Sequence, residues 1–323
     1  MNQNITFIYS HKCHPVTGVL ANSVCDRTIQ LKKYPIHSIT GPIHAFFKGL
    51  FMGKGENYFC ESPISVIPPM VRRFFLGEKN KIIYRGIDGL FYEKEDSYLA
   101  SKNPVKRWLL KKIIKNIDFV ICDSTLVKND AEKFGKSAFV CESFSFDYEK
   151  YHTLKPSLTG NIFISIGEYR PPFDHKGFED LLKLFNNLKY ELIIVGKNTE
   201  QLNKYVNNPK IKIMGFQKDL TPLLSRATFY IHLAKYEAGP ISVLESAIAG
   251  LIPIVNSKTG YKDIVYKIDN KLIIKNNNLK SYIKMSRSTR LTLSKKAKKI
   301  SGNYTQDKIL KKFRKTISGC ING

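Results

Sequence analysis

The chain has 323 residues, enough for one large domain or for two domains of ordinary size. Hydrophobic residues make up 43% and charged residues 24%, which is typical of a soluble globular protein. The first residues lack the basic start of a signal peptide, and no uncharged apolar run approaches the ~20 residues that span a bilayer. The six cysteines form no C-x-x-C pair, which favours a reduced, cytoplasmic protein.

The charge is the most unusual bulk property. The chain has 52 Lys and Arg against 27 Asp and Glu, a formal net charge of +25. This balance favours an anionic partner, such as nucleic acid, an acidic lipid surface or a phosphorylated substrate. A general enrichment in Lys, Asn and Ile is the alternative explanation.

The first half of the chain predicts short apolar strands and one clear helix. The strands are expected over residues 5–9, 58–60, 81–84, 118–122 and 138–141. The helix is expected over 104–116, with apolar residues on one face and lysines elsewhere. The polar stretch 151–160 breaks the pattern and is typical of a linker.

The second half predicts strands and helices in regular alternation. Strands are expected over 161–167, 191–196, 210–215, 228–233 and 253–255. Helices are expected over 177–186, 220–226 and 241–249, with a basic amphipathic helix over 303–317. This alternation predicts a parallel sheet covered on both faces. The chain is therefore expected to be α/β, with two domains and a cleft between them, and with ligands beyond the carboxyl ends of the strands.

Two carboxylates, Glu237 and Glu245, stand on either side of a Gly239-Pro240 step. The predicted strand 228–233 brings the first of them to the carboxyl edge of the sheet. The proline suits the first position of the helix that follows, because its missing N–H costs nothing there. The spacing alone is also compatible with two solvent-exposed acids.

The predicted helix start offers free backbone N–H groups at Ile241, Ser242 and Val243. Such a helix N-terminus is an anion site. We expect an anion at these amides with a carboxylate in front of it and another beside it. That arrangement describes a phosphate carried between hydroxyl-rich groups.

With the segments that follow, this region resembles the signature of retaining GT-B glycosyltransferases of family 4, the glycosyl transferases group 1. The resemblance rests on E-x7-E, on Gly-Leu-Ile-Pro-Ile-Val over 250–255 and on the turn 259–265. It extends over 161–265, and 118–124 is similar to the family's last N-domain strand.

The resemblance implies the GT-B fold, in which two Rossmann-like domains face each other across a cleft. The acceptor-side domain would cover 1–155 and the nucleotide-sugar domain 156–302. A C-terminal helix within 303–323 would return to the first domain.

The resemblance also implies roles for the residues around the E-x7-E motif. Glu245 would hold the ribose hydroxyls of the donor, and Glu237 would face the donor sugar ring. The backbone from Gly239 through Pro240 and Ile241 to Ser242 would meet the diphosphate. His232 lies within an apolar strand, which indicates a core histidine rather than a ligand.

The segment 166–177 resembles the family's G-R…K-G loop, whose two cations neutralise the leaving diphosphate. Glu168 stands where the family has Arg, so the Arg role passes to Arg170, and the Lys role to Lys176. Two cations would stabilise the developing charge without a metal. The chain has no Asp-x-Asp triplet, the metal site of GT-A glycosyltransferases, and we predict no metal and no cofactor beyond the donor.

Three further predictions concern the donor and the sugar. Gly18, in the segment 15–19, would let the backbone approach the diphosphate as in the family's glycine-rich loop. Asp88 follows a predicted strand and would act near the transferred sugar, or it simply caps a turn. Gly215 and Phe216 would lie against the nucleobase.

The resulting hypothesis is a metal-independent, retaining glycosyltransferase. It would move a hexose-type sugar from a UDP- or GDP-sugar to a hydroxyl of a glycan or lipid-linked acceptor. The alternatives are a polyanion-binding protein on a Rossmann scaffold and an inactive GT-B homologue. Nucleic acid is the less favoured partner, because no nucleic-acid-reading module is visible and the carboxylates would repel phosphate backbones.

An anionic membrane surface is a further candidate partner, which would place the protein on the cytoplasmic face of a membrane. The helix 104–116 is basic, and segments 46–54 and 71–76 mix cations with aromatic residues, as interfaces do. Core packing is the alternative use for many of these aromatics.

Overall fold

The computed structural model describes residues 4–10, 12–31, 40–87, 89–92, 101–275 and 278–322. It forms two compact units: Met1–Glu142 with Asp307–Gly323 (unit 1), and Ser143–Gln306 (unit 2). Among the described residues, none of the helices combines the length and the hydropathy that a membrane span requires.

The division falls after residue 142, whereas the boundary implied by the resemblance lies at 155. The segment between these positions is bound to unit 2 by hydrogen bonds. The Ser143 N–H donates to Tyr261 Oη (2.9 Å), and Lys298 Nζ donates to the carbonyls of His152 and Leu154 (2.6 Å each).

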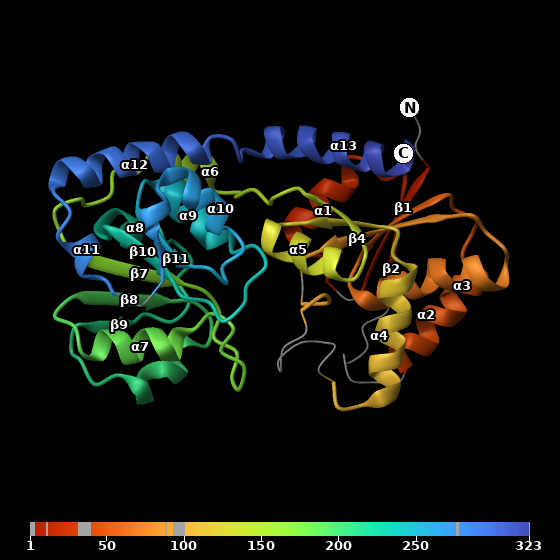
Figure 1. The fold of residues 1–323 in the computed structure, drawn as a ribbon, viewed down its shortest axis with the longest axis horizontal. Helices are drawn as coiled ribbons and strands as arrows, with labels where there is room; N and C mark the ends of the chain where they lie inside the picture. The colour runs from red at the N-terminus through yellow and green to blue at the C-terminus, as the bar shows by residue number, and fades with distance from the viewer. Residues whose placement is uncertain are drawn as a thin grey trace. The chain divides into compact units, whose positions relative to one another are not determined.

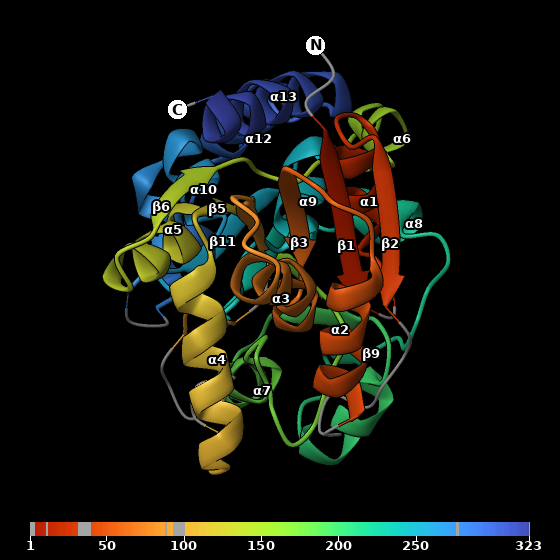
Figure 2. The same cartoon turned by 90° about the vertical axis from the view of Figure 1, so that its right-hand side faces the viewer.

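Unit 1 is built on a six-stranded parallel sheet in the order β2-β1-β3-β4-β5-β6. Its strands are β1 Ile5–Ser10, β2 Arg27–Leu31, β3 Asn57–Glu61, β4 Lys81–Gly86, β5 Phe119–Cys122 and β6 Ser137–Val140. Its helices are α1 Pro15–Asn22, α2 Thr40–Phe51, α3 Ile67–Phe75, α4 Pro104–Asn116, α5 Thr125–Lys133 and α13 Gln306–Asn322, with a 3-10 turn η1 Pro63–Val66 (Figure 2).

The edge strand β2 is the strand of unit 1 that the sequence pattern missed. Arg27, Thr28 and Gln30 are exposed, while Ile29 and Leu31 are buried. An edge strand with one solvated face alternates polar and apolar residues, so it lacks the continuous apolar run of the central strands.

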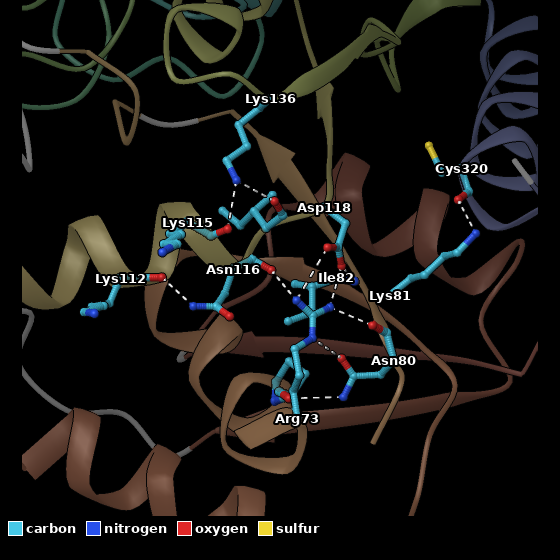
Figure 3. Close-up of polar contacts among 12 residues, drawn as sticks. Arg73, Asn80, Lys81, Ile82, Lys112, Lys115, Asn116, Asp118, Lys136 and Cys320 are labelled. Atoms are coloured by element: carbon cyan, nitrogen blue, oxygen red, sulfur yellow. Dashed lines mark hydrogen bonds and ion pairs between the residues drawn. The ribbon is translucent and has the colours of Figure 1, made fainter. Parts of the chain in front are cut away.

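The C-terminal helix α13 packs on the sheet of unit 1, which is why residues from Asp307 onward belong to this unit. The rings of Phe313 and Phe59 lie 5.4 Å apart. Lys81 Nζ donates to the carbonyls of Cys320 (3.4 Å) and Ile321 (2.6 Å), and Figure 3 shows the first of these bonds.

A polar network ties α3 and α4 to the sheet of unit 1 (Figure 3). Arg73 lies at its centre and donates to Asp118 Oδ2 (2.5 Å), to Asn80 O (2.6 Å) and to Asn116 O (3.1 Å). The same Asp118 oxygen accepts from the Ile82 N–H at 2.7 Å. One guanidinium therefore connects α3, the end of α4 and the starts of β4 and β5.

Unit 2 is built on a second six-stranded parallel sheet, in the order β12-β11-β10-β7-β8-β9 (Figure 1). Its strands are β7 Ile162–Ile166, β8 Glu191–Val195, β9 Ile211–Ile213, β10 Phe229–His232, β11 Ile252–Asn256 and β12 Ile273–Ile274. Its helices are α6 Tyr148–His152, α7 Phe178–Asn186, α8 Thr221–Arg226, α9 Ile241–Ala249, α10 Lys262–Ile268, α11 Lys280–Ile283 and α12 Arg287–Ser301, with 3-10 turns η3 Thr199–Tyr205 and η4 Asn270–Leu272. The predicted α/β class with two Rossmann-like sheets is confirmed.

Candidate functional site

The strand order of unit 2 marks one position on the sheet. Strands β7 and β10 are neighbours, but the chain continues from β7 to β8 on one side and from β10 to β11 on the other. In open parallel sheets, ligands bind beyond the carboxyl ends of the strands at such a switch point. The segments that leave these two strands, 167–177 and 233–240, carry the predicted Lys176 and Glu237.

Lys176 and Glu237 meet at this switch point. Lys176 Nζ forms an ion pair with Glu237 Oε1, and the other carboxylate oxygen lies 2.5 Å from His232 Nε2. Burial alone would raise the pKa of Glu237, but Lys176 and His232 outweigh it and hold that pKa well below its usual range. The carboxylate is therefore ionised, and it fixes a cation at the edge of the sheet.

A buried hydrogen-bond chain continues behind this ion pair. Tyr230 Oη lies 3.3 Å from His232 Nδ1 and 2.8 Å from Ser242 Oγ, and Ser242 Oγ donates to the Ile166 carbonyl at 3.4 Å. His232 is a core residue as expected, with no exposed surface, but it also contacts Glu237. The sequence signal for this second role was its position, five residues before Glu237 at the end of an apolar strand.

Two glycines allow Lys176 to occupy its place. Its side chain lies over Gly167, where a Cβ would overlap the Lys176 methylenes. Gly177 has φ +70°, and a Cβ there would overlap the Leu233 carbonyl. A side chain at either glycine would displace the lysine or the strand end beside it.

Arg170 has a different partner from Lys176. Its side chain is 71% exposed, and Nη2 lies 2.6 Å from Glu168 Oε2. The pKa of Glu168 is lowered, mainly by the hydrogen bond from Arg170, with Lys197 and Lys176 contributing. The departure from the family pattern at Glu168 thus places an acid among three cations. The joint role of Arg170 and Lys176 on one diphosphate stays a prediction.

Helix α9 spans Ile241–Ala249, the residues that the sequence pattern indicated, but Pro240 precedes its first position instead of occupying it. Pro240 is its N-cap, with φ −69° and ψ 103°, and Ile241 is its first residue. The expectation for Val243 is wrong, because its N–H donates to the Pro240 carbonyl at 3.0 Å. Ile241 and Ser242 open the helix, where backbone N–H groups lack intrahelical partners, and Gly239 precedes the cap.

Glu245 lies about one turn into α9 and is half-buried. Ser145 Oγ donates to Glu245 Oε1 at 2.8 Å, and burial raises the pKa of this carboxyl. In the described part of the chain no Lys, Arg or His forms an ion pair with it. Ser145 was not predicted, because the sequence pattern assigned its segment to the first domain.

Gly215 and Phe216 lie after β9. Gly215 has φ +63°, its carbonyl accepts from the Gly196 N–H at 2.8 Å, and a Cβ there would overlap Glu200. The Phe216 ring is 62% exposed, with Lys197 Nζ 5.7 Å from its centroid. An exposed aromatic face of this kind can stack on a planar base.

The two residues predicted in unit 1 have different outcomes. Gly18 lies inside α1, where its N–H donates to His14 O at 2.9 Å, so the segment 15–19 is helical and not the expected glycine loop. The role of Gly18 at the diphosphate stays a prediction. A Cβ on Gly18 would make an ordinary 3.4 Å contact with Cys13 Sγ. Asp88 falls outside the described residues, so its role stays a prediction.

A carboxylate that sequence reasoning missed lies at the switch point of unit 1, where β1 and β3 are neighbours. Glu61 ends β3, is 8% exposed, and accepts from the His14 N–H at 3.0 and 3.3 Å. Ser62, which follows, has φ +95°, a costly conformation for a residue with a side chain, and its Oγ lies 2.8 Å from Ser10 Oγ. Burial, and after it the charge of Arg85, lowers the pKa of His14.

Within the described ranges, no three His, Cys, Asp or Glu side chains are grouped in a way that could hold a metal ion. The expectation that no metal is needed stays a prediction.

The comparisons with known proteins concern the family of residues 149–305 and the fold of the chain. Residues 149–305 match the family model for glycosyl transferases group 1. No curated protein matches the sequence. Among solved structures, HepE from Anabaena in complex with UDP is 12% identical, with a TM-score of 0.69 over 98% of this chain and 100% of that chain.

Two further solved structures are similar over nearly the whole chain. Sucrose-phosphate synthase from Thermosynechococcus elongatus is 14% identical, with a TM-score of 0.72 over 98% of both chains. The lipopolysaccharide outer core galactosyltransferase WaaB is also 14% identical, with a TM-score of 0.71 over 98% of this chain and 99% of that one. The chain thus has the GT-B fold, and its residues 149–305, which carry Lys176, Glu237 and Glu245, match the glycosyl transferases group 1 family.

Proposed function

We propose that the protein is a retaining glycosyltransferase that moves a hexose-type sugar from a UDP- or GDP-sugar to a hydroxyl of a glycan or lipid-linked acceptor. The observation that carries this proposal is the Lys176–Glu237 ion pair at the switch point of unit 2. The family match over 149–305 supports it. HepE has been solved with UDP, with UDP and glucose and with UDP-glucose, which favours a UDP-sugar among the two donor classes.

The donor diphosphate would bind at the N-terminus of α9. The amides of Ile241 and Ser242 and the helix dipole favour an anion there. The carboxylate of Glu245, which has no paired cation in the described structure, would accept hydrogen bonds from the ribose hydroxyls, and Phe216 would stack on the base. Glu237 would accept hydrogen bonds from the sugar ring.

In the reaction, the bond between the anomeric carbon and the diphosphate oxygen breaks. The acceptor oxygen forms the new bond on the same face, and its proton passes to the leaving phosphate oxygen. Lys176, with Arg170 as the second cation, would stabilise the charge that develops on the diphosphate. This division of work needs neither a protein nucleophile nor a metal, so we expect activity to survive a chelator.

We assign acceptor binding to the carboxyl edge of the sheet in unit 1. Glu61 and His14 lie at its switch point. A carboxylate and an imidazole that is neutral at pH 7 can each accept a hydrogen bond from a hydroxyl.

The proposal is tested by incubating the purified full-length protein with a panel of UDP-, GDP- and ADP-sugars, with and without EDTA. We expect release of one nucleoside diphosphate that EDTA does not reduce, and an anomeric configuration retained in the product. Donor binding without release would indicate an inactive homologue. Salt-dependent binding of polyanions with no response to any donor would favour the polyanion-binding alternative.

A further inference from the structure

Helices α2, α3 and α4 of unit 1 are neighbours (Figures 1 and 2). They expose several large apolar side chains. Phe51 is 83% exposed and Trp108 is 59% exposed. The other exposed members of this apolar face are Ile43, Phe47, Phe74, Phe75, Leu76 and Val105. Apolar exposure that gathers on one face, unlike singly scattered residues, marks an interaction surface.

The apolar face contains a pocket of about 420 Å³. All the side chains that line it are apolar: Pro42, Ile43, Phe46, Phe47, Ile67, Met70, Val71, Phe74, Phe75 and Leu109. They come from α2, from α3 and, through Leu109, from α4. A cavity of this size without polar partners suits a hydrocarbon and offers nothing to orient a polar ligand.

The charged side chains that these three helices carry are all positive. The helices α2, α3 and α4 contain no Asp or Glu. Their exposed cations are Lys48, Arg107, Lys111, Lys112 and Lys115. Among the described residues, no carboxylate forms an ion pair with any of these five cations.

The two arginines of α3, in contrast, serve the fold. Arg72 is 7% exposed, forms an ion pair with Glu78 and donates to the Gly49 carbonyl at 3.1 Å. Arg73 is held by Asp118 (Figure 3). The composition of the segment 71–76 suggested that its cations face an interface. The structure shows instead that they are bound within unit 1. These arginines fix α3 against α2 and the sheet, so its aromatic residues are presented by a rigid helix.

We propose that the α2–α3–α4 face of unit 1 docks on an anionic phospholipid bilayer. An acyl chain enters the apolar pocket, and the cations of α4 contact lipid phosphate groups. Apolar burial and attraction to anionic lipid act together in this mode of binding. A second copy of the chain is the less suitable occupant, because two such faces would oppose only positive charges. The inference goes beyond the proposed transferase activity and rests on unit 1 alone.

The chain supplies its own probe, because Trp108 is its only tryptophan and lies on the exposed side of α4. With vesicles of phosphatidylglycerol, we expect Trp108 emission to move to shorter wavelength, and brominated acyl chains to quench it. High salt should weaken both effects, since contact with lipid phosphates is screened. Vesicles of phosphatidylcholine should give neither. Absence of quenching by brominated anionic lipid, or equal quenching by neutral lipid, would overturn the proposal.

Matched variants separate this face from the overall positive charge. Lys111→Glu with Lys112→Glu should weaken binding to anionic vesicles at least about tenfold. The control pair, Lys295→Glu with Lys296→Glu on α12, changes the net charge equally and should leave binding unchanged. Equal losses in the two pairs would overturn the proposal.

The pocket has its own test. Phe74→Ala with Phe75→Ala should reduce quenching of Trp108 by brominated lipid, while Tyr266→Ala, an exposed aromatic of unit 2, should not. We expect both variants to unfold at the same temperature as the parent protein, because the replaced rings are more than half exposed. Self-association at rising concentration, without vesicle binding, would assign the face to a second copy and overturn the lipid proposal.

Discussion

Glu61 in unit 1 and Glu237 in unit 2 occupy equivalent places, since each lies at the switch point of its own parallel sheet. Their environments shift the pKa values of these two carboxyls in opposite directions. Burial raises the pKa of Glu61, whereas Lys176 and His232 overcome burial and lower the pKa of Glu237. The comparison teaches that burial at a strand end does not by itself define the charge of a carboxylate. At Glu237, the charge is set by Lys176, which the neighbouring loop brings next to the carboxylate.

The variant Lys176→Ala would make Glu237 resemble Glu61, and we expect it to have the largest effect on activity. Without the ammonium, the pKa of Glu237 rises and the leaving diphosphate loses its fixed cation. Turnover should fall about 10²- to 10³-fold, as for other preorganised groups that stabilise developing charge. The measurement is kcat for nucleoside diphosphate release with the donor identified in the panel.

Arg170→Ala is the matched control for the loss of one positive charge. Its exposed ion pair with Glu168 should contribute no more than about 1 kcal/mol to stability. We expect kcat to fall by less than about tenfold, which corresponds to 1.4 kcal/mol. Near-normal turnover in Lys176→Ala, or equal losses in the two variants, would contradict the role given to the ion pair.

The sequence predicted what depends on local pattern and missed what depends on tertiary contact. The central strands and α4 were found because their apolar periodicity survives in any context. Lys176 and Glu237 were found because a glycine-flanked lysine and E-x7-E are local motifs. Ser145 and Glu61 could not be found in this way, because their significance comes from Glu245, 100 residues away, and from the order of β1 and β3.

The predicted loop around Gly18 shows the opposite error. The resemblance to the family's glycine-rich loop favoured a loop, but Pro15 suits the first turn of a helix, and the chain forms α1 there. The expectation that the segment 71–76 exposes its arginines was wrong for a related reason. Composition cannot show that Glu78 and Asp118 are close enough to bind Arg72 and Arg73.

Glu245 extends the comparison, because it is a carboxylate of unit 2 whose pKa is raised by burial as that of Glu61 is. With no cation paired to it in the described structure, it is available to ligand hydroxyls. Glu245→Ala should raise the donor KM about 10- to 100-fold, the loss expected for hydrogen bonds to a charged group. Ser145→Ala, which keeps the carboxylate and removes its 2.8 Å hydrogen bond, should raise KM less. An unchanged KM in Glu245→Ala would remove this residue from the donor site.

The smallest expected effect is on stability, and it tests the opposite pKa shifts directly. Glu61 has a folded pKa above its unfolded value, so its contribution is fully present below about pH 4.3 and is lost as the pH rises through the folded pKa. Glu237 has a folded pKa below its unfolded value. Its contribution is therefore present above about pH 4.3 and is lost only as the pH falls through that depressed pKa.

Glu61→Gln and Glu237→Gln should consequently differ in sign and in pH dependence when thermal unfolding is followed from pH 4 to pH 8. Glu61→Gln should gain stability relative to the parent as the pH rises, because the parent then carries a buried charge that the amide does not. Glu237→Gln should be destabilised by a constant amount above about pH 5, because its carboxylate stays ionised and paired throughout. Each kcal/mol should move Tm by about 2–4 °C for units of this size. Parallel curves for the two variants would show that the ammonium of Lys176 is not what separates these two carboxylates.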